Sequence, residues 1–159
     1  MDFNNIYDTY AQQVFRICMG YTNDSEKAKD LVQETFISVW RNLASFRNQS
    51  KMSTWIFRIA TNHCLRAIEV SRRMTIDKLP AQLVEPQAGD SMEEKLALLY
   101  RCIEELPEIE RIIIALLLED VPQAEIALIV GFSDANTRAR IHRIKEKLAV
   151  KCKVYGQSK

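Results

Sequence analysis

The stretch that decides the fold is Pro122–Leu148, which reads PQAEIALIVGFSDANTRARIHRIKEKL. Its first half is a short apolar segment that ends at Gly131, where a glycine lets the chain turn sharply. Ser133 then suits the N-cap of a second helix. That helix carries five cations: Arg138, Arg140, Arg143, Lys145 and Lys147. The pattern predicts a helix-turn-helix with a basic second helix, the arrangement that places a helix in the DNA major groove.

Within the basic helix, an apolar stripe at helical spacing predicts the face that packs on the core. The stripe consists of Thr137, Ile141, Ile144 and Leu148. The predicted DNA contacts lie at the start of the helix, and Thr137 is counted among them as well. They are Ser133, Asn136, Thr137, Arg138, Arg140, His142 and Arg143. The agreement of turn, stripe and charge favours a DNA-binding helix over an ordinary basic surface.

Composition predicts an all-α protein. The 159 residues are 47% hydrophobic, with four glycines and four prolines, and helical spacing recurs along most of the chain. No apolar run is long enough to span a bilayer, and the first residues do not resemble an export signal. Four scattered cysteines and two histidines form no ligand spacing, which favours reduced thiols in a cytoplasmic protein without a metal or other cofactor. The sequence contains no nucleophile–base set and no phosphate-binding loop, so it does not indicate an enzyme.

A net charge of +1 conceals a strong pattern. Residues 1–75 hold ten Lys and Arg against seven Asp and Glu, and residues 131–159 hold eight against two. Residues 76–130, between them, hold four against twelve. Two separated basic blocks fit a polyanion that touches the protein in two places. Basic helices are also common as solvated surfaces, so charge alone decides little.

The chain divides into two predicted helical domains. Residues 1–73 form the first, and residues 91–159 form the second, which ends in the helix-turn-helix. Residues 74–90 contain two prolines and a glycine without an apolar period, which predicts a flexible, acidic linker. The second domain begins with a capping box, because Ser91 precedes Glu94 by three residues. In the first domain, Ser25 is predicted to cap the second helix, and Ser53 or Thr54 is predicted to cap the third.

A polar row lies on the predicted third helix of the first domain. Arg58, Asn62 and Arg66 are spaced at i, i+4 and i+8, so they share one face. Such a row would suit a DNA backbone, with the asparagine amide reading a base. The alternative is an ordinary solvated face, which the spacing alone slightly favours.

The segment before that helix mixes aromatic and cationic side chains around a polar loop. Its predicted contacts with single-stranded DNA are Phe46, Arg47, Lys51 and Trp55. Aromatic rings beside a flexible polar loop suit unstacked bases. The alternative is that the aromatics are core residues, and for Phe57 that alternative is favoured.

The predicted second helix of the first domain has an acidic and amide side. Asp30, Gln33 and Glu34 occupy it, and Trp40 follows further along. An exposed row of this kind fits a protein-docking face, and a solvated helix side fits equally well.

Together these segments resemble a bacterial sigma factor of the extracytoplasmic-function type. The resemblance rests on Asp30–Phe36 (DLVQETF), Ser45–Arg47 (SFR), Thr54–Asn62 (TWIFRIATN), Leu106-Pro107 and the helix-turn-helix. These motifs occur in order over nearly the whole chain. The sequence departs from the family at Asn136-Thr137, where Thr-Val is frequent, and at Arg138-Ala139, where a cation followed by Ser is frequent.

The resemblance implies a promoter-specificity subunit. The second helix, through Asp30, Gln33, Glu34 and Trp40, would dock on the clamp helices of the largest subunit of core RNA polymerase. The Phe46–Lys51 loop and the third helix would melt the −10 element and capture a flipped base, and the last helix would read the −35 element as duplex. The partners implied are therefore core RNA polymerase, promoter DNA and a membrane-linked anti-sigma factor.

Two rival interpretations stay open from the residues alone. A stand-alone helix-turn-helix regulator would bind duplex operators without polymerase, but it leaves Trp55, Asn62 and the DLVQETF stretch unexplained. A helical adaptor with basic faces for acidic proteins is the second rival.

Overall fold

The computed structural model describes residues 2–74 and 91–157, with the side chains of 68–74 and 155–157 left aside. Over these residues the protein is all-α, as the sequence predicts, with seven α-helices and one short 3-10 turn. The predicted linker falls almost wholly on residues 75–90, which lie outside the described residues.

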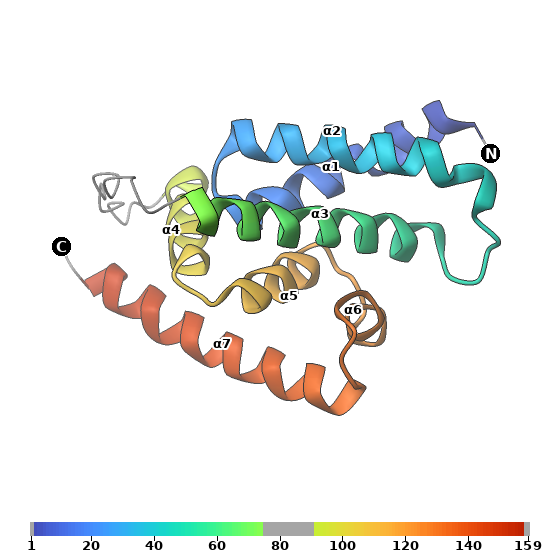
Figure 1. The fold of residues 1–159 in the computed structure, drawn as a ribbon. Helices are drawn as coiled ribbons and strands as arrows, with labels where there is room; N and C mark the ends of the chain where they lie inside the picture. The colour runs from blue at the N-terminus through green and yellow to red at the C-terminus, as the bar shows by residue number, and fades with distance from the viewer. Residues whose placement is uncertain (1, 75–90, 158–159) are drawn as a thin grey trace.

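Three helices build the first unit: α1 (Phe3–Thr22), α2 (Ser25–Asn42) and α3 (Met52–Met74). The 3-10 turn η1 (Leu43–Ser45) follows α2 directly. Figure 1 shows α2 and α3 lying side by side, with α1 behind them. Their buried faces are apolar, and Val14, Val39 and Ile56 are fully buried.

Two helix starts in this unit differ from the predicted ones. The cap of α2 is Asp24 and not Ser25, because the extended Asp24 accepts from the backbone N–H groups of Glu26 and Lys27, at 3.0 and 3.2 Å. The prediction that Ser53 or Thr54 caps the third helix is wrong too. That helix already begins at Met52, and Thr54 is buried within its first turn.

Four helices build the second unit: α4 (Met92–Glu104), α5 (Glu108–Leu118), α6 (Gln123–Val130) and α7 (Asp134–Gln157). The Ser91 cap is confirmed, because its hydroxyl accepts from the Glu94 N–H at 3.1 Å. The turn of the helix-turn-helix is confirmed as well. Gly131 ends α6 with φ at +79°, and the Ser133 hydroxyl accepts from the Asn136 N–H at 3.1 Å.

The two units pack against each other. Helix α1 lies against α4 and α5, and α3 lies against α6 (Figure 1). The closest approach is at Gly20, where an added Cβ would lie 2.9 Å from the Cβ of Ala115. Only a residue without a side chain allows α1 and α5 to come this close. The sequence predicted two linked domains but not this contact.

Polar pairs at the edge of this contact also join the units. The Arg16 guanidinium donates to both carboxylate oxygens of Glu119, at 2.6 and 3.0 Å. The hydrogen bond to Glu119 raises the pKa of Arg16 further above its ordinary value. The Asn23 amide donates to Glu104 at 3.1 Å, and the Arg111 guanidinium lies 5.0 Å from the centre of the Tyr21 ring.

Among the described residues, no helix is both long and apolar enough to cross a membrane.

Candidate nucleic-acid interface

The loop between α2 and α3 is backed by an aromatic pair. The Phe46 and Trp55 rings lie 4.7 Å apart between centroids, with their planes tilted by 31°. Within the loop, Asn48 adopts a left-handed conformation with φ at +55°, which reverses the chain. Arg47 and Lys51 are both exposed. The loop therefore presents cations and amides in front of a partly exposed indole.

The predicted polar row lies on one open side of α3. Arg58, Asn62 and Arg66 are all exposed, and Phe57, on the opposite side, is 3% exposed and belongs to the core. The side chains of the row thus share a solvent-facing surface that begins next to the loop. In such a row the two guanidinium groups suit backbone phosphates, and the amide between them suits the edge of a single base.

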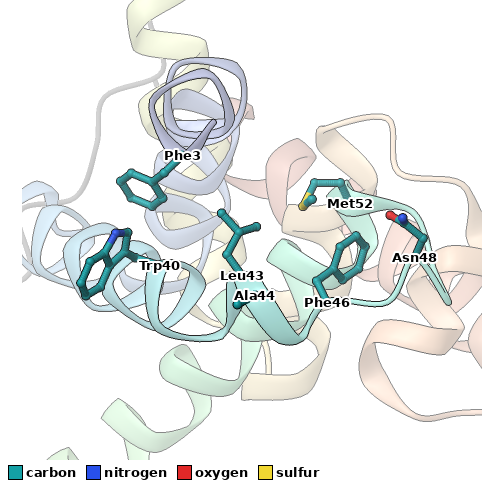
Figure 2. Close-up of a pocket in the computed structure, with 7 residues that line it drawn as sticks. All are labelled: Phe3, Trp40, Leu43, Ala44, Phe46, Asn48 and Met52. Carbon is teal, nitrogen blue, oxygen red and sulfur yellow. The ribbon is translucent and has the colours of Figure 1, made fainter. Parts of the chain in front are cut away.

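A shallow hollow of about 650 Å³ joins this loop to the N-terminal end of α1. Figure 2 shows Phe3 and Trp40 on one side of it and Phe46, Asn48 and Met52 on the other. Trp40 is 65% exposed. The sequence grouped Trp40 with the acidic side of α2, whereas the structure brings it to the edge of the loop.

The second unit covers part of the same surface. A hollow of about 430 Å³ lies between the loop and α6, and Trp55, Arg58 and Leu128 line it. The Lys51 ammonium reaches the Glu125 carboxylate, 2.6 Å away. Sequence reasoning missed this contact, because no local pattern connects a loop cation with a carboxylate in α6. The one available signal for close packing of the units was Gly20, an isolated glycine inside a helical pattern.

The start of α7 holds a second group of predicted contacts. Arg138, His142 and Arg143 are exposed, together with the capping residue Ser133. Arg140 is half-buried: its guanidinium lies 4.6 Å from the centre of the Phe132 ring and donates to the Asn136 amide oxygen at 3.1 Å. These contacts fix the direction of the Arg140 side chain before any ligand is bound, which lowers the entropy cost of a directed contact.

Thr137 is a correction to the predicted set. Its side chain is fully buried, so it packs beneath α7 and does not reach a ligand on the outer face. The stripe of Thr137, Ile141, Ile144 and Leu148 is confirmed as a core face, since all four are buried. A side chain on a helix points to one face only, and that of Thr137 points to the core.

The acidic and amide side of α2 is exposed, but its residues lie beside two different helices. Asp30 and Gln33 border a groove of about 530 Å³ between α1 and α2, whose floor includes Ala11 and Phe15. Glu34 instead lies beside α3, 3.6 Å from Nδ1 of His63. The Ser38 hydroxyl bonds the other ring nitrogen of that histidine at 2.8 Å. In the part of the chain that is described, no cluster of three or more metal-ligating side chains is present.

Two family models match the two units. The one described as Sigma-70 region 2 matches residues 6–74, and the one described as Sigma-70, region 4 matches residues 96–148. The chain is 30% identical to the ECF RNA polymerase sigma-E factor of Escherichia coli over 161 residues, spanning 92% of this chain and 84% of that protein. The chain belongs to the ECF family of RNA polymerase sigma factors. The resemblance seen in the sequence is thereby confirmed.

Other similar proteins agree with this assignment. SigW of Bacillus subtilis is 27% identical, and the match spans 92% of this sigma factor and 86% of that one. SigG of Mycobacterium tuberculosis is 38% identical over 92 residues, but the match spans 58% of this chain and only 24% of SigG.

Solved structures share the fold of this sigma factor. The sigma factor RpoE of Bartonella quintana, in complex with the anti-sigma factor NepR, superposes with a TM-score of 0.80 at 22% identity, covering 96% of this chain and 98% of that chain. CnrH, in complex with the cytosolic domain of CnrY, gives 0.70 at 19% identity, covering 93% and 85%.

Proposed function

We propose that this sigma factor binds core RNA polymerase and directs it to promoters, reading the −35 element as duplex and the −10 element as a separated strand. One observation carries the proposal. Two groups of exposed cations lie on the two different sigma regions, one beside the exposed Asn62 at the loop and α3 and the other at the start of α7. Two such surfaces on one chain suit two separated DNA segments.

The loop and α3 would capture the −10 strand. Trp55 offers a ring on which an unpaired base can stack, and stacking is worth about 1–3 kcal/mol per base. Asn62 presents an amide, the group that pairs with adenine through two hydrogen bonds. Arg58 and Arg66 lie one helical turn to either side of Asn62 and would hold the flanking phosphates.

The start of α7 would enter the major groove at the −35 element. Arg138, His142 and Arg143 are open to solvent on the outer face, and Arg140 is already oriented by Phe132 and Asn136. The backbone N–H groups of the first turn add a positive end that favours phosphate. Binding should therefore weaken strongly with salt, because each neutralised phosphate releases counterions.

The exposed side of α2 would dock on the clamp helices of the polymerase. Asp30, Gln33 and Glu34 supply carboxylate and amide acceptors there, and the groove beside Asp30 and Gln33 has an apolar floor. Carboxylates at the rim of an apolar groove suit a basic, amphipathic helical partner.

The packing of the two units implies a step before promoter binding. Glu125 and Leu128 of α6 lie against the loop that would hold the −10 strand. We propose that the two units separate on the polymerase. We also propose that a membrane-linked anti-sigma factor blocks this separation in the uninduced cell. In this view the protein acts in the cytoplasm by binding alone, and the chemistry belongs to the polymerase.

In vitro transcription with purified core polymerase tests the proposal. Run-off assays on sheared genomic DNA should give discrete transcripts only when the protein is added. Co-purification with core polymerase distinguishes a sigma factor from a stand-alone helix-turn-helix regulator, and promoter-specific mobility shifts exclude an adaptor for acidic proteins. Transcripts that begin at random positions, or at the same positions without the protein, would contradict it.

A further inference from the structure

The four cysteines, scattered in the sequence, form two facing pairs in space. Cys18 of α1 lies 3.9 Å from Cys64 of α3, measured between the sulfur atoms, and Cys102 of α4 lies 3.2 Å from Cys152 of α7. Each pair joins the first and last helix of one unit. All four thiols are free. The arrangement serves no step of the proposed promoter binding.

The two pairs differ in access. Cys18 and Cys64 are both fully buried in the core of the first unit. In the second unit Cys102 is fully buried, but Cys152 is partly exposed near the end of α7. A dissolved oxidant can therefore reach one thiol of the second pair and neither thiol of the first. Access to solvent is a main determinant of which cysteines oxidise.

The geometry points to Cys102 and Cys152 as a disulfide site that hydrogen peroxide or a related peroxide closes reversibly. The Cys152 thiol donates to the Cys102 sulfur across 3.2 Å. A disulfide needs a sulfur separation of about 2.05 Å, so the two atoms must approach by about 1 Å. Side-chain rotation at the last turns of α7 can supply a movement of this size.

The reaction balances with one peroxide. The Cys152 thiol releases its proton, its sulfur attacks one peroxide oxygen and the O–O bond breaks. The leaving hydroxide takes up the proton that Cys152 released and departs as water. The Cys102 sulfur then attacks the Cys152 sulfur, the S–O bond of the sulfenic acid breaks, and the second hydroxide takes the Cys102 proton. Two thiols are oxidised by two electrons in total, and the peroxide becomes two waters.

Burial assigns the order of these steps. Burial raises the pKa of Cys102 to about 12, so this thiol keeps its proton at neutral pH. Cys102 is therefore the second thiol to react and the one that supplies the proton. In the other pair, the hydrogen bond to Cys18 and burial raise the pKa of Cys64 well above its ordinary value, which adds to its protection.

The bond would hold the end of α7 on α4. Two ion pairs already act in the same region, since Lys147 reaches Glu110 at 3.0 Å and Lys151 reaches Glu105 at 3.4 Å. A covalent link between residues 102 and 152 closes a loop that spans α5, α6 and most of α7. Such a link restricts the unfolded chain, so the oxidised protein should unfold at a higher temperature than the reduced one.

Peptide mapping by mass spectrometry tests the site on the intact, folded protein. After limited hydrogen peroxide treatment, a linked peptide containing Cys102 and Cys152 should form and should disappear on reduction with dithiothreitol. Cys18 and Cys64 should remain available to alkylation once the protein is unfolded. Cys152→Ser should leave Cys102 reduced, and Cys102→Ala should accumulate a sulfenic acid at Cys152 that dimedone traps. Cys64→Ala, which removes one thiol of the other pair, should oxidise like the wild type.

Thermal unfolding supplies a second readout that does not depend on the substitutions at the buried Cys64 and Cys102. Oxidation should raise the unfolding temperature of the wild-type protein and leave that of Cys152→Ser unchanged. The inference is overturned if peroxide gives Cys152 sulfinic acid or disulfide-linked dimers without the internal link. Oxidation of Cys18 and Cys64 at the same rate, or a lower unfolding temperature in the oxidised wild type, overturns it as well.

Discussion

The Lys51 ammonium lies 2.6 Å from the Glu125 carboxylate, and this ion pair joins the candidate −10 loop to α6 of the other sigma region. The cation assigned to the melted strand is thus paired with a carboxylate of the same chain. A DNA phosphate at this place would compete directly with Glu125. Through this ion pair, the packing of the two units makes the loop less accessible to DNA.

Glu125→Gln should increase binding of a single-stranded −10 oligonucleotide to the free protein. Glu125 is only 16% exposed, but Lys51 is 72% exposed, so solvent screens the pair. Screened ion pairs are worth about 0–1 kcal/mol, so we expect a gain of at most about fivefold. Fluorescence anisotropy at low salt measures it. Glu93→Gln, on the exposed first turn of α4, makes the same change of charge away from the loop. Equal affinities of the two variants would argue against competition by Glu125.

Gly20→Ala should loosen the contact between the units. The added Cβ would lie 2.9 Å from the Cβ of Ala115, which is too close, whereas helix propensity alone predicts a gain of up to about 1 kcal/mol. We expect a larger radius of gyration by small-angle scattering.

Combining Gly20→Ala with Ala115→Gly should restore the compact form, because the second change removes the atom that clashes. Ala124→Gly, at an exposed position of α6, controls for the helix propensity of an Ala-to-Gly change. If Ala124→Gly compensates as well as Ala115→Gly, the close approach is not the cause.

Asn62→Ala should impair strand separation at the promoter more than duplex binding. The amide is exposed on α3 beside two arginines and has no part in the core. Loss of a two-bond contact to a base costs about 1–3 kcal/mol, so permanganate reactivity of −10 thymines should fall about tenfold in the holoenzyme. Asn5→Ala, exposed on α1, is the matched control. Unchanged reactivity in Asn62→Ala would remove this residue from the −10 site.

Thr137→Val should leave −35 binding unchanged and should not lower stability. The side chain is fully buried, and among the described residues its hydroxyl oxygen has no hydrogen-bond partner. Replacing an unpaired buried hydroxyl by a methyl group of similar shape should raise the free energy of unfolding, by up to about 1 kcal/mol. Denaturant unfolding and duplex binding measure the two effects. A clear loss of −35 affinity with intact stability would return Thr137 to the DNA surface.

Arg140→Ala should weaken binding to −35 duplex by about 1–3 kcal/mol if the oriented guanidinium contacts a base. Arg143→Ala should act differently, because an exposed cation that meets a phosphate lowers the slope of log affinity against log salt by about one for all sequences. Titrations at several salt concentrations, on a −35 duplex and a scrambled duplex, separate the two effects. Arg41→Ala, exposed in the last turn of α2, is the control for lost positive charge.

The sequence by itself determined the local elements of this protein. The Ser91 and Ser133 caps, the turn at Gly131 and the buried stripe of α7 follow from interactions between residues at most four positions apart, which a linear pattern displays. The exposed row on α3 follows from the same helical spacing. The sequence placed the cap of α2 one residue too late, at Ser25, because the extended backbone of Asp24 brings its carboxylate to the first free N–H groups of the helix.

Tertiary structure alone decided what lies across the two units. The contacts of Gly20 with Ala115, Arg16 with Glu119 and Lys51 with Glu125 join residues far apart in the chain, and no periodicity encodes them. The pairing of Cys102 with Cys152 lies within the second unit, but it too joins residues far apart in the chain. Which face of a helix is apolar depends on its own sequence, but which partner covers that face depends on how all the helices pack together.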